Sequence, residues 1–249
     1  MNDMGIFFAD LHVHTEASPD GRSSLDALTA AAKTAGLHAL AVTDHNLCTP
    51  VPPEKNGVLL IPGCEVSTRA GHITALFLEK PLPAFDSLPA AEDAVAAIHD
   101  AGALAVLAHP YQKPGAAPEN FAFRTDAVET ANARAALKVP AANRLAARLA
   151  ESLSLPAAGG SDAHDAKEIG NACTVLTAPE LTLSALREAL ASGQTAAVLY
   201  RDTPHIRKGL SQWTKARRSG VIKLPKAAAY LAWCAVQDFR KAKGGPAED

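Results

Sequence analysis

The chain has 249 residues, 48% of them hydrophobic, and a formal net charge of −2 at neutral pH. This length suits one α/β barrel. Since no run approaches about 20 apolar residues, we expect no membrane span or membrane partner. No basic segment precedes a long apolar core near the N-terminus, so we expect no secretory leader. The four cysteines form no CxxC pair, which indicates reduced thiols in a cytoplasmic protein.

Short apolar runs, each followed by polar residues, alternate with helical patterns along the chain. Such runs are typical of buried parallel strands, and their alternation with helices indicates a barrel rather than an open sheet. The expected strands are residues 6–11, 39–42, 58–61, 72–78, 104–107, 125–129, 156–159 and 173–176. The expected helices are residues 24–35, 89–101, 141–154 and 184–192.

The last fifth of the chain differs in charge from the rest. Residues 201–249 contain eleven Lys or Arg and four Asp or Glu, which leaves residues 1–200 strongly acidic. We therefore expect a barrel domain over 1–200 and a basic helical extension over 201–249, with an amphipathic helix at 226–241. Trp213 beside Lys215, Arg217 and Arg218 could bind nucleic acid. A helix docked on the barrel with solvated charges is the interpretation we favour.

Side chains that can bind metal follow the predicted strands. His12 and His14 are two residues apart at a strand end, so both imidazoles can face one ion. Asp162 and His164 repeat this spacing. Four further candidates follow other strands, namely Asp44, His45, Glu65 and His109. Because the carboxyl ends of parallel strands meet at one rim, these groups should converge there. A mixture of imidazole and carboxylate suits zinc, manganese or iron.

The segments that carry these residues resemble the motifs of the PHP (polymerase and histidinol phosphatase) superfamily. They are Leu11–Thr15 with Ser18–Gly21, Val42–Asn46, Gly63–Glu65, Ala108–Pro110 and Gly160–His164. Five motifs in the family's order cover about residues 6–176. The resemblance implies a distorted (β/α)7 TIM-like barrel of the PHP type that holds two or three divalent ions (Mn, Zn or Fe).

The same resemblance implies how the ligands divide among the ions. The first ion would be held by His12, His14, Glu65 and Asp162. Glu65 would bridge to a second ion, which is also held by His72 and His109. A third would be held by Asp20, His45 and His164. Asp44 would orient an imidazole or a bound water.

This ligand set predicts a metal-dependent phosphoesterase in which water activated by the ions attacks a phosphate monoester. The substrate would be a small molecule, such as a nucleotide, a sugar phosphate or histidinol phosphate. Arg134, which follows a predicted strand, is the expected phosphate contact. Only 36 residues separate His72 from His109, which leaves little room for a substrate cap and indicates an open site. The alternatives are a nuclease or nucleotidase acting on polynucleotide ends, and an accessory domain of a polymerase.

Overall fold

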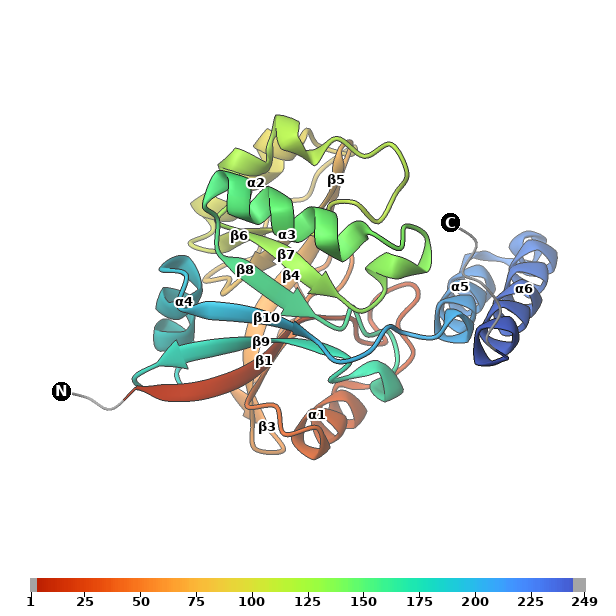
Figure 1. The fold of residues 1–249 in the computed structure, drawn as a ribbon, viewed down its shortest axis with the longest axis horizontal. Coiled ribbons are helices and arrows are strands. Elements are labelled where there is room, and N and C mark those ends of the chain that lie inside the picture. Colours follow the sequence, from red (N-terminus) through yellow and green to blue (C-terminus); the bar gives the residue numbers. More distant parts are fainter. Residues whose placement is uncertain (1–3, 244–249) are drawn as a thin grey trace.

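The computed structural model describes residues 4–243. It has mixed α/β architecture, with a nearly closed, barrel-shaped sheet, helices packed outside it, and two further helices at the C-terminal end (Figure 1). The strands are β1 (Gly5–Val13), β2 (Ala39–Val42), β3 (Glu54–Lys55), β4 (Val58–Thr68), β5 (Gly71–Leu76), β6 (Leu104–Ala108), β7 (Ala127–Asn132), β8 (Ala157–Gly160), β9 (Ala172–Ala178) and β10 (Thr195–Leu199).

The sheet is mixed, so the prediction of a parallel sheet is wrong in two places. Along the order β10-β9-β1-β2-β4-β5-β6-β7-β8, strand β5 is antiparallel to both neighbours, and β9 is antiparallel to β1 and β10. Arg69 and Ala70 alone connect β4 to β5, and so short a link permits only an antiparallel hairpin. Strands β3 and β10 were not predicted from the sequence.

The barrel closes through side chains between β8 and β9. Thr174 of β9 donates its hydroxyl to the carbonyl oxygen of Gly159 and accepts the N–H of the same residue. A Cβ at Gly159 would lie 2.5 Å from the carbonyl oxygen of Cys173, so only glycine permits this approach. The interior is filled by small and branched side chains, among them Leu11, Ile61 and Leu176.

The four predicted helices are present, with ends shifted by one or two residues. They are α1 (Leu25–Thr34), α2 (Ala91–Asp100), α3 (Ala142–Leu153) and α4 (Leu183–Ala191). Ser24 caps α1 and Thr182 caps α4 by accepting a backbone N–H, which fixes where each helix begins. The apolar faces of α2 and α3 cover β5, β6 and β7, in a cluster that includes Ile98, Leu107 and Leu149.

The C-terminal region forms a pair of helices, α5 (His205–Ser219) and α6 (Leu224–Ala242), joined by the short 3-10 turn η5 (Val221–Lys223). The sequence pattern predicted α6 but not α5, because α5 is too polar to show an apolar face. Gly209 lets the two helices approach closely, since a Cβ there would lie 2.8 Å from Leu231 Cδ1. None of the helices within residues 4–243 combines the length and apolar character that crossing a bilayer requires.

Candidate metal centre

The predicted ligands converge at one rim of the barrel. His12 lies next to the last residue of β1, Glu65 lies in β4, and His109 follows β6. His72 reaches the same rim because β5 is antiparallel, so the beginning of that strand pairs with the end of β6 at Ala108. His45 and Glu65 form an isolated parallel bridge, which places these two side by side.

Glu65 occupies the middle of the cluster and is fully buried. Its Oε1 lies 2.7 Å from His72 Nδ1 and 3.0 Å from His109 Nε2. Its Oε2 lies 2.6 Å from His45 Nδ1. One carboxylate therefore faces imidazoles from three different strand ends, which is the arrangement that a bridging ligand needs.

Asp162 and Asp20 extend the cluster on either side of His14. Asp162 Oδ1 lies 3.4 Å from His14 Nε2, and Asp20 Oδ1 lies 3.5 Å from His164 Nε2 and 3.6 Å from His45 Nε2. His14 also lies next to His164, with 4.2 Å between the ring centroids. Burial, together with His164 and His45, lowers the pKa of His14 well below its usual range, which favours the neutral imidazole that can bind a metal.

The geometry of these groups fits divalent ions. Potential ligand atoms within 4.8 Å of one another form four overlapping groups: His14, His45 and His164; His12, Glu65 and His109; His12, His14 and Asp162; and His45, Glu65 and His72. Within residues 4–243, buried polar atoms at the cluster lack a hydrogen-bond partner, namely His12 Nε2, His14 Nε2, Asp20 Oδ1 and Glu65 Oε2. Because buried polar atoms are normally satisfied, these four point to ions as their partners.

The charges within the cluster keep its carboxylates ionised. Burial raises the pKa of Glu65, but His72, His45 and His12 lower it by a larger amount. The net pKa therefore lies well below its usual range. Asp162 behaves in the same way, because His12 and His14 outweigh the effect of burial on its pKa. Ionised carboxylates are the form that binds a cation.

Two of these residues have strained backbones. His109 has φ of 29° and Asp162 has φ of 53°, in the left-handed region that side chains other than glycine rarely adopt. Non-glycine residues in this region cluster at functional sites, where surrounding contacts hold them in place. At His109 one such contact is visible, because its backbone N–H donates to Glu129 Oε2 over 2.8 Å.

Glu129, which was not among the predicted site residues, supports two of the ligands. In addition to its contact with His109, its Oε1 lies 3.0 Å from His12 Nδ1, and Asn132 Nδ2 donates to its Oε2 over 2.9 Å. The His12–Glu129 contact leaves His12 Nε2 to face the cluster. The available signal was an acidic residue within the apolar strand β7.

Glu129→Gln should weaken metal binding about 10- to 100-fold, because the amide keeps the shape of the side chain but loses the charge that makes His12 a strong ligand. Competition against a chromophoric chelator would measure the change. Glu151→Gln, on the exposed face of α3, is the matched control. Equal metal affinity in both variants would exclude this role for Glu129.

Two side chains predicted to take part in catalysis make other contacts. Asp44 accepts hydrogen bonds from the backbone N–H of Thr15 over 2.7 Å and from the hydroxyls of Thr15 and Thr49. It therefore orders the loops after β1 and β2, and no ligand imidazole is among its hydrogen-bond partners within residues 4–243.

Arg134 is buried, and its guanidinium is engaged by protein groups. It donates two hydrogen bonds of 2.7 Å to the Glu168 carboxylate and one of 3.0 Å to Ser211 Oγ. A buried bidentate ion pair thus orients Arg134 toward Glu168, and its contact with a phosphate stays a prediction. Glu168 lies in the short turn after His164, a position that the sequence pattern did not distinguish.

An α/β barrel whose rim carries imidazoles and carboxylates at ligand spacing belongs to the class of metal-dependent hydrolases. Comparison with models of protein families identifies the family within this class. The PHP domain model matches residues 10–88, and the PHP-associated model matches residues 140–195. The chain belongs to the PHP family, as its motifs predicted.

Individual proteins resemble this chain in sequence or in fold. MJ1587 of Methanocaldococcus jannaschii, an uncharacterized protein, is 32% identical over 118 residues, which span 41% of this chain and 67% of that protein. A two-domain protein of Bacteroides vulgatus, described as containing a predicted PHP-like metal-dependent phosphoesterase, is 26% identical with a TM-score of 0.63, over 79% of this chain and 65% of that one. The lesion-specific endonuclease EndoQ of Pyrococcus furiosus is 19% identical with a TM-score of 0.58, over 78% and 58% of the two chains, which shows a shared fold.

Proposed function

We propose that this chain hydrolyses phosphate monoesters of small molecules by means of two or three divalent ions (Mn, Zn or Fe) held at the barrel rim. The observation that carries the proposal is the position of Glu65, whose two oxygens face imidazoles on opposite sides within 2.6–3.0 Å. Nucleotides, sugar phosphates and histidinol phosphate are all candidate substrates, and a cytoplasmic location stays a prediction.

The ligand sets of the proposal follow the contacts of the cluster. His12, His14, Glu65 and Asp162 would hold one ion, Glu65 with His72 and His109 a second, and Asp20 with His45 and His164 a third. The proximity of His45 to Glu65 and His72 supports its placement between the second and third positions. Bound divalent ions supply water activation near neutral pH and neutralise charge on phosphoryl oxygens.

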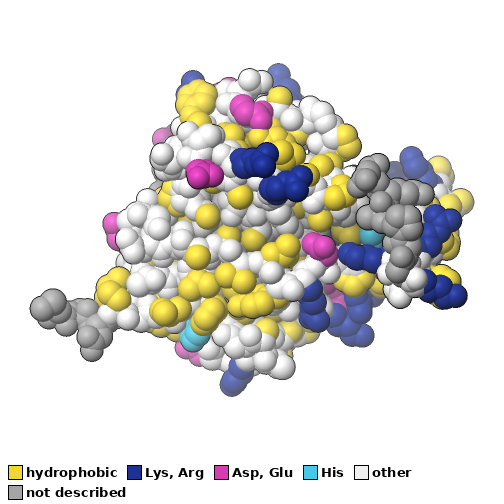
Figure 2. All heavy atoms as spheres, in the orientation of Figure 1, with side chains coloured by type: hydrophobic (Ala, Val, Ile, Leu, Met, Phe, Trp, Pro, Cys, Tyr) yellow, Lys and Arg dark blue, Asp and Glu magenta, His cyan; other side chains and the backbone are white. Residues whose placement is uncertain are grey.

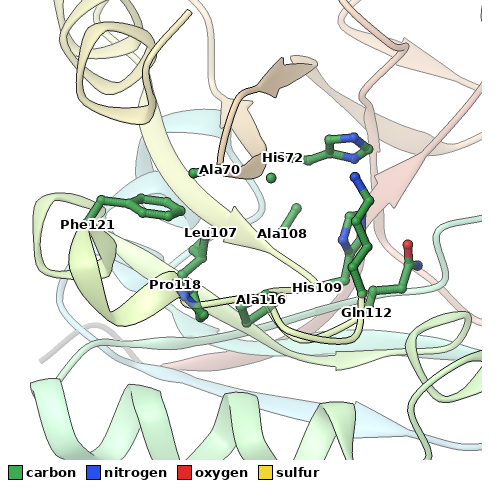
Figure 3. Close-up of a pocket in the computed structure, with 12 residues that line it drawn as sticks. Ala70, His72, Leu107, Ala108, His109, Gln112, Ala116, Pro118 and Phe121 are labelled. Carbon is green, nitrogen blue, oxygen red and sulfur yellow. The ribbon is translucent and has the colours of Figure 1, made fainter. Parts of the chain in front are cut away.

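The pocket beside the cluster provides a group that can bind the phosphate. His72 and His109 line one side of it, while Leu107, Ala116 and Phe121 make the rest largely apolar (Figure 3). Lys113 is an exposed residue that lines the same pocket. With Arg134 engaged by Glu168, Lys113 is the basic side chain that we assign to the phosphate oxygens.

Lys113→Met should lower kcat/KM for an aryl phosphate about 10- to 100-fold, since a hydrogen bond to a charged group contributes about 1.5–3 kcal/mol. The loss should appear mainly in KM, because the ligands of the metal centre are unchanged. Lys80→Met, at an exposed position before α2, is the control and should behave like the wild type. Equal kinetics for both variants would contradict the role of Lys113.

The function itself is tested on protein whose metals have been measured. Release of phosphate from an aryl phosphate, followed by a screen of small phosphate monoesters, is the expected result. Metal-loaded protein that turns over no ester would overturn the proposal and favour an accessory domain. Turnover of polynucleotide ends without turnover of any small monoester would favour the nuclease alternative.

A further inference from the structure

A groove of about 660 Å³ lies between α5, α6 and Lys138, the residue that ends the 3-10 turn η3 (Ala135–Leu137). Its basic lining consists of Lys138, Lys208, Lys215, Lys223 and Lys226. Figure 2 shows Lys and Arg side chains gathered over the C-terminal helices. No acidic residue lines the groove within residues 4–243, so its charge is entirely positive.

The helical repeat places these lysines on facing sides of the groove. On α5, Lys208, Gln212 and Lys215 follow at intervals of four and three residues, so they share one face. On α6 and the turn before it, Lys223, Lys226 and Tyr230 follow at intervals of three and four residues, so they also share one face. Basic faces of both helices therefore line one groove, together with Tyr230.

Among residues 4–243, no carboxylate forms an ion pair with a groove lysine. Asp238 of α6 instead caps α5, where it accepts the backbone N–H groups of His205 and Ile206, each over 2.8 Å. Within residues 4–243, no groove lysine has a carboxylate oxygen within 4.0 Å, while Lys55 and Lys241 elsewhere do. Crowded cations without counter-ions favour a bound polyanion.

Helix α5, which forms one side of the groove, also contacts segments next to the metal centre. Ser211 of α5 accepts a hydrogen bond from Arg134, and Arg218 of the same helix donates to the carbonyl oxygen of Ser18 in the Asp20 loop over 2.6 Å. Burial, together with the charge of Lys138, lowers the pKa of Lys208 to about 8, while the Asp162 carboxylate opposes this shift.

We infer that this groove binds the sugar–phosphate backbone of a single-stranded polynucleotide and leads its terminal phosphate to the metal centre. The inference rests on the proposed function and extends its substrate from small molecules to the phosphorylated end of a strand. A small monoester needs one phosphate site, which the cluster and Lys113 supply, whereas five lysines along one groove can contact several phosphates. Tyr230 can stack on an unpaired base, whose face a duplex would hide. In the reaction, water oxygen bonds to phosphorus, the ester P–O bond breaks, and the strand leaves as its protonated alcohol.

The test compares two charge-matched double variants on the same helices. Lys215→Glu/Lys226→Glu changes the groove, while Arg217→Glu/Arg240→Glu changes exposed residues outside it. The probe is a 5′-phosphorylated oligothymidylate of about 12 nucleotides, followed by fluorescence anisotropy at several salt concentrations. The groove variant should bind the oligonucleotide at least about tenfold more weakly. The slope of log affinity against log salt should also become shallower by about 1.4, because each of the two lost phosphate contacts contributes about 0.7.

Aryl phosphate hydrolysis separates this inference from the proposed function. Both variants should keep wild-type turnover of the aryl phosphate, whereas the groove variant alone should show a raised KM for the oligonucleotide. Equal oligonucleotide affinity in the two variants, or binding of the wild type only to phosphatidylserine vesicles, would overturn the groove assignment. A wild type that binds the strand but hydrolyses no ester would instead contradict the proposed function.

Discussion

Glu65→Gln should lower kcat/KM for an aryl phosphate by at least about a thousandfold and reduce the number of ions that purify with the protein. The carboxylate lies within 3.5 Å of five imidazoles: those of His12, His14, His45, His72 and His109. Its replacement by a neutral amide removes the charge that a bridging ligand shares between ions. Lewis-acid stabilisation of several kcal/mol would be lost with the ions, which corresponds to the expected loss of rate.

The comparison for this variant is Glu92→Gln, on the exposed side of α2, which should retain full activity and full metal content. Circular dichroism of both proteins checks that the fold is preserved, because glutamine has nearly the volume of glutamate. If Glu65→Gln kept wild-type activity and metal stoichiometry, Glu65 could not be a bridging ligand, and the assignment of the centre would be wrong.

The fold class and the residues that meet at the rim were predictable because strand ends and motif spacing are local properties of the sequence. His12 and His14 illustrate this, since alternation in β1 and the motif around it suffice to place both imidazoles together. The position of His72 could not be predicted from strand ends and motif spacing alone. Its arrival at the rim depends on the antiparallel direction of β5, which follows from the two-residue link to β4 and not from any apolar pattern.

Contacts between distant segments were the part that the sequence could not predict. Glu129 supports His12 across 117 positions, and Arg134 pairs with Glu168 across 34. Each looked like an ordinary polar residue near a strand end. Helix α5 was missed for a related reason: it packs on α6 and on polar groups of the barrel, so its sequence lacks the apolar stripe that marks a helix on a core.

Arg134→Met should lower the free energy of unfolding by about 3–5 kcal/mol, since it leaves the buried Glu168 carboxylate without its partner. Both side chains are almost fully buried, with 3% and 1% of their surface exposed. Glu168 also accepts the backbone N–H of His164 over 3.3 Å, so the lost ion pair lies directly behind a predicted metal ligand. Urea unfolding of metal-saturated protein, followed by circular dichroism, measures the change.

The double variant Arg134→Met/Glu168→Leu separates the cost of an unpaired charge from the value of the pair. Because both charges are removed together, it should be more stable than Arg134→Met alone, within about 2 kcal/mol of the wild type. Lys55→Met is the exposed control, since its pair with Asp26 is solvated and should contribute at most about 1 kcal/mol. A double variant no more stable than Arg134→Met would mean that the guanidinium acts through Ser211 and the seating of α5. The basic groove would then depend on Arg134 for its position beside the metal centre.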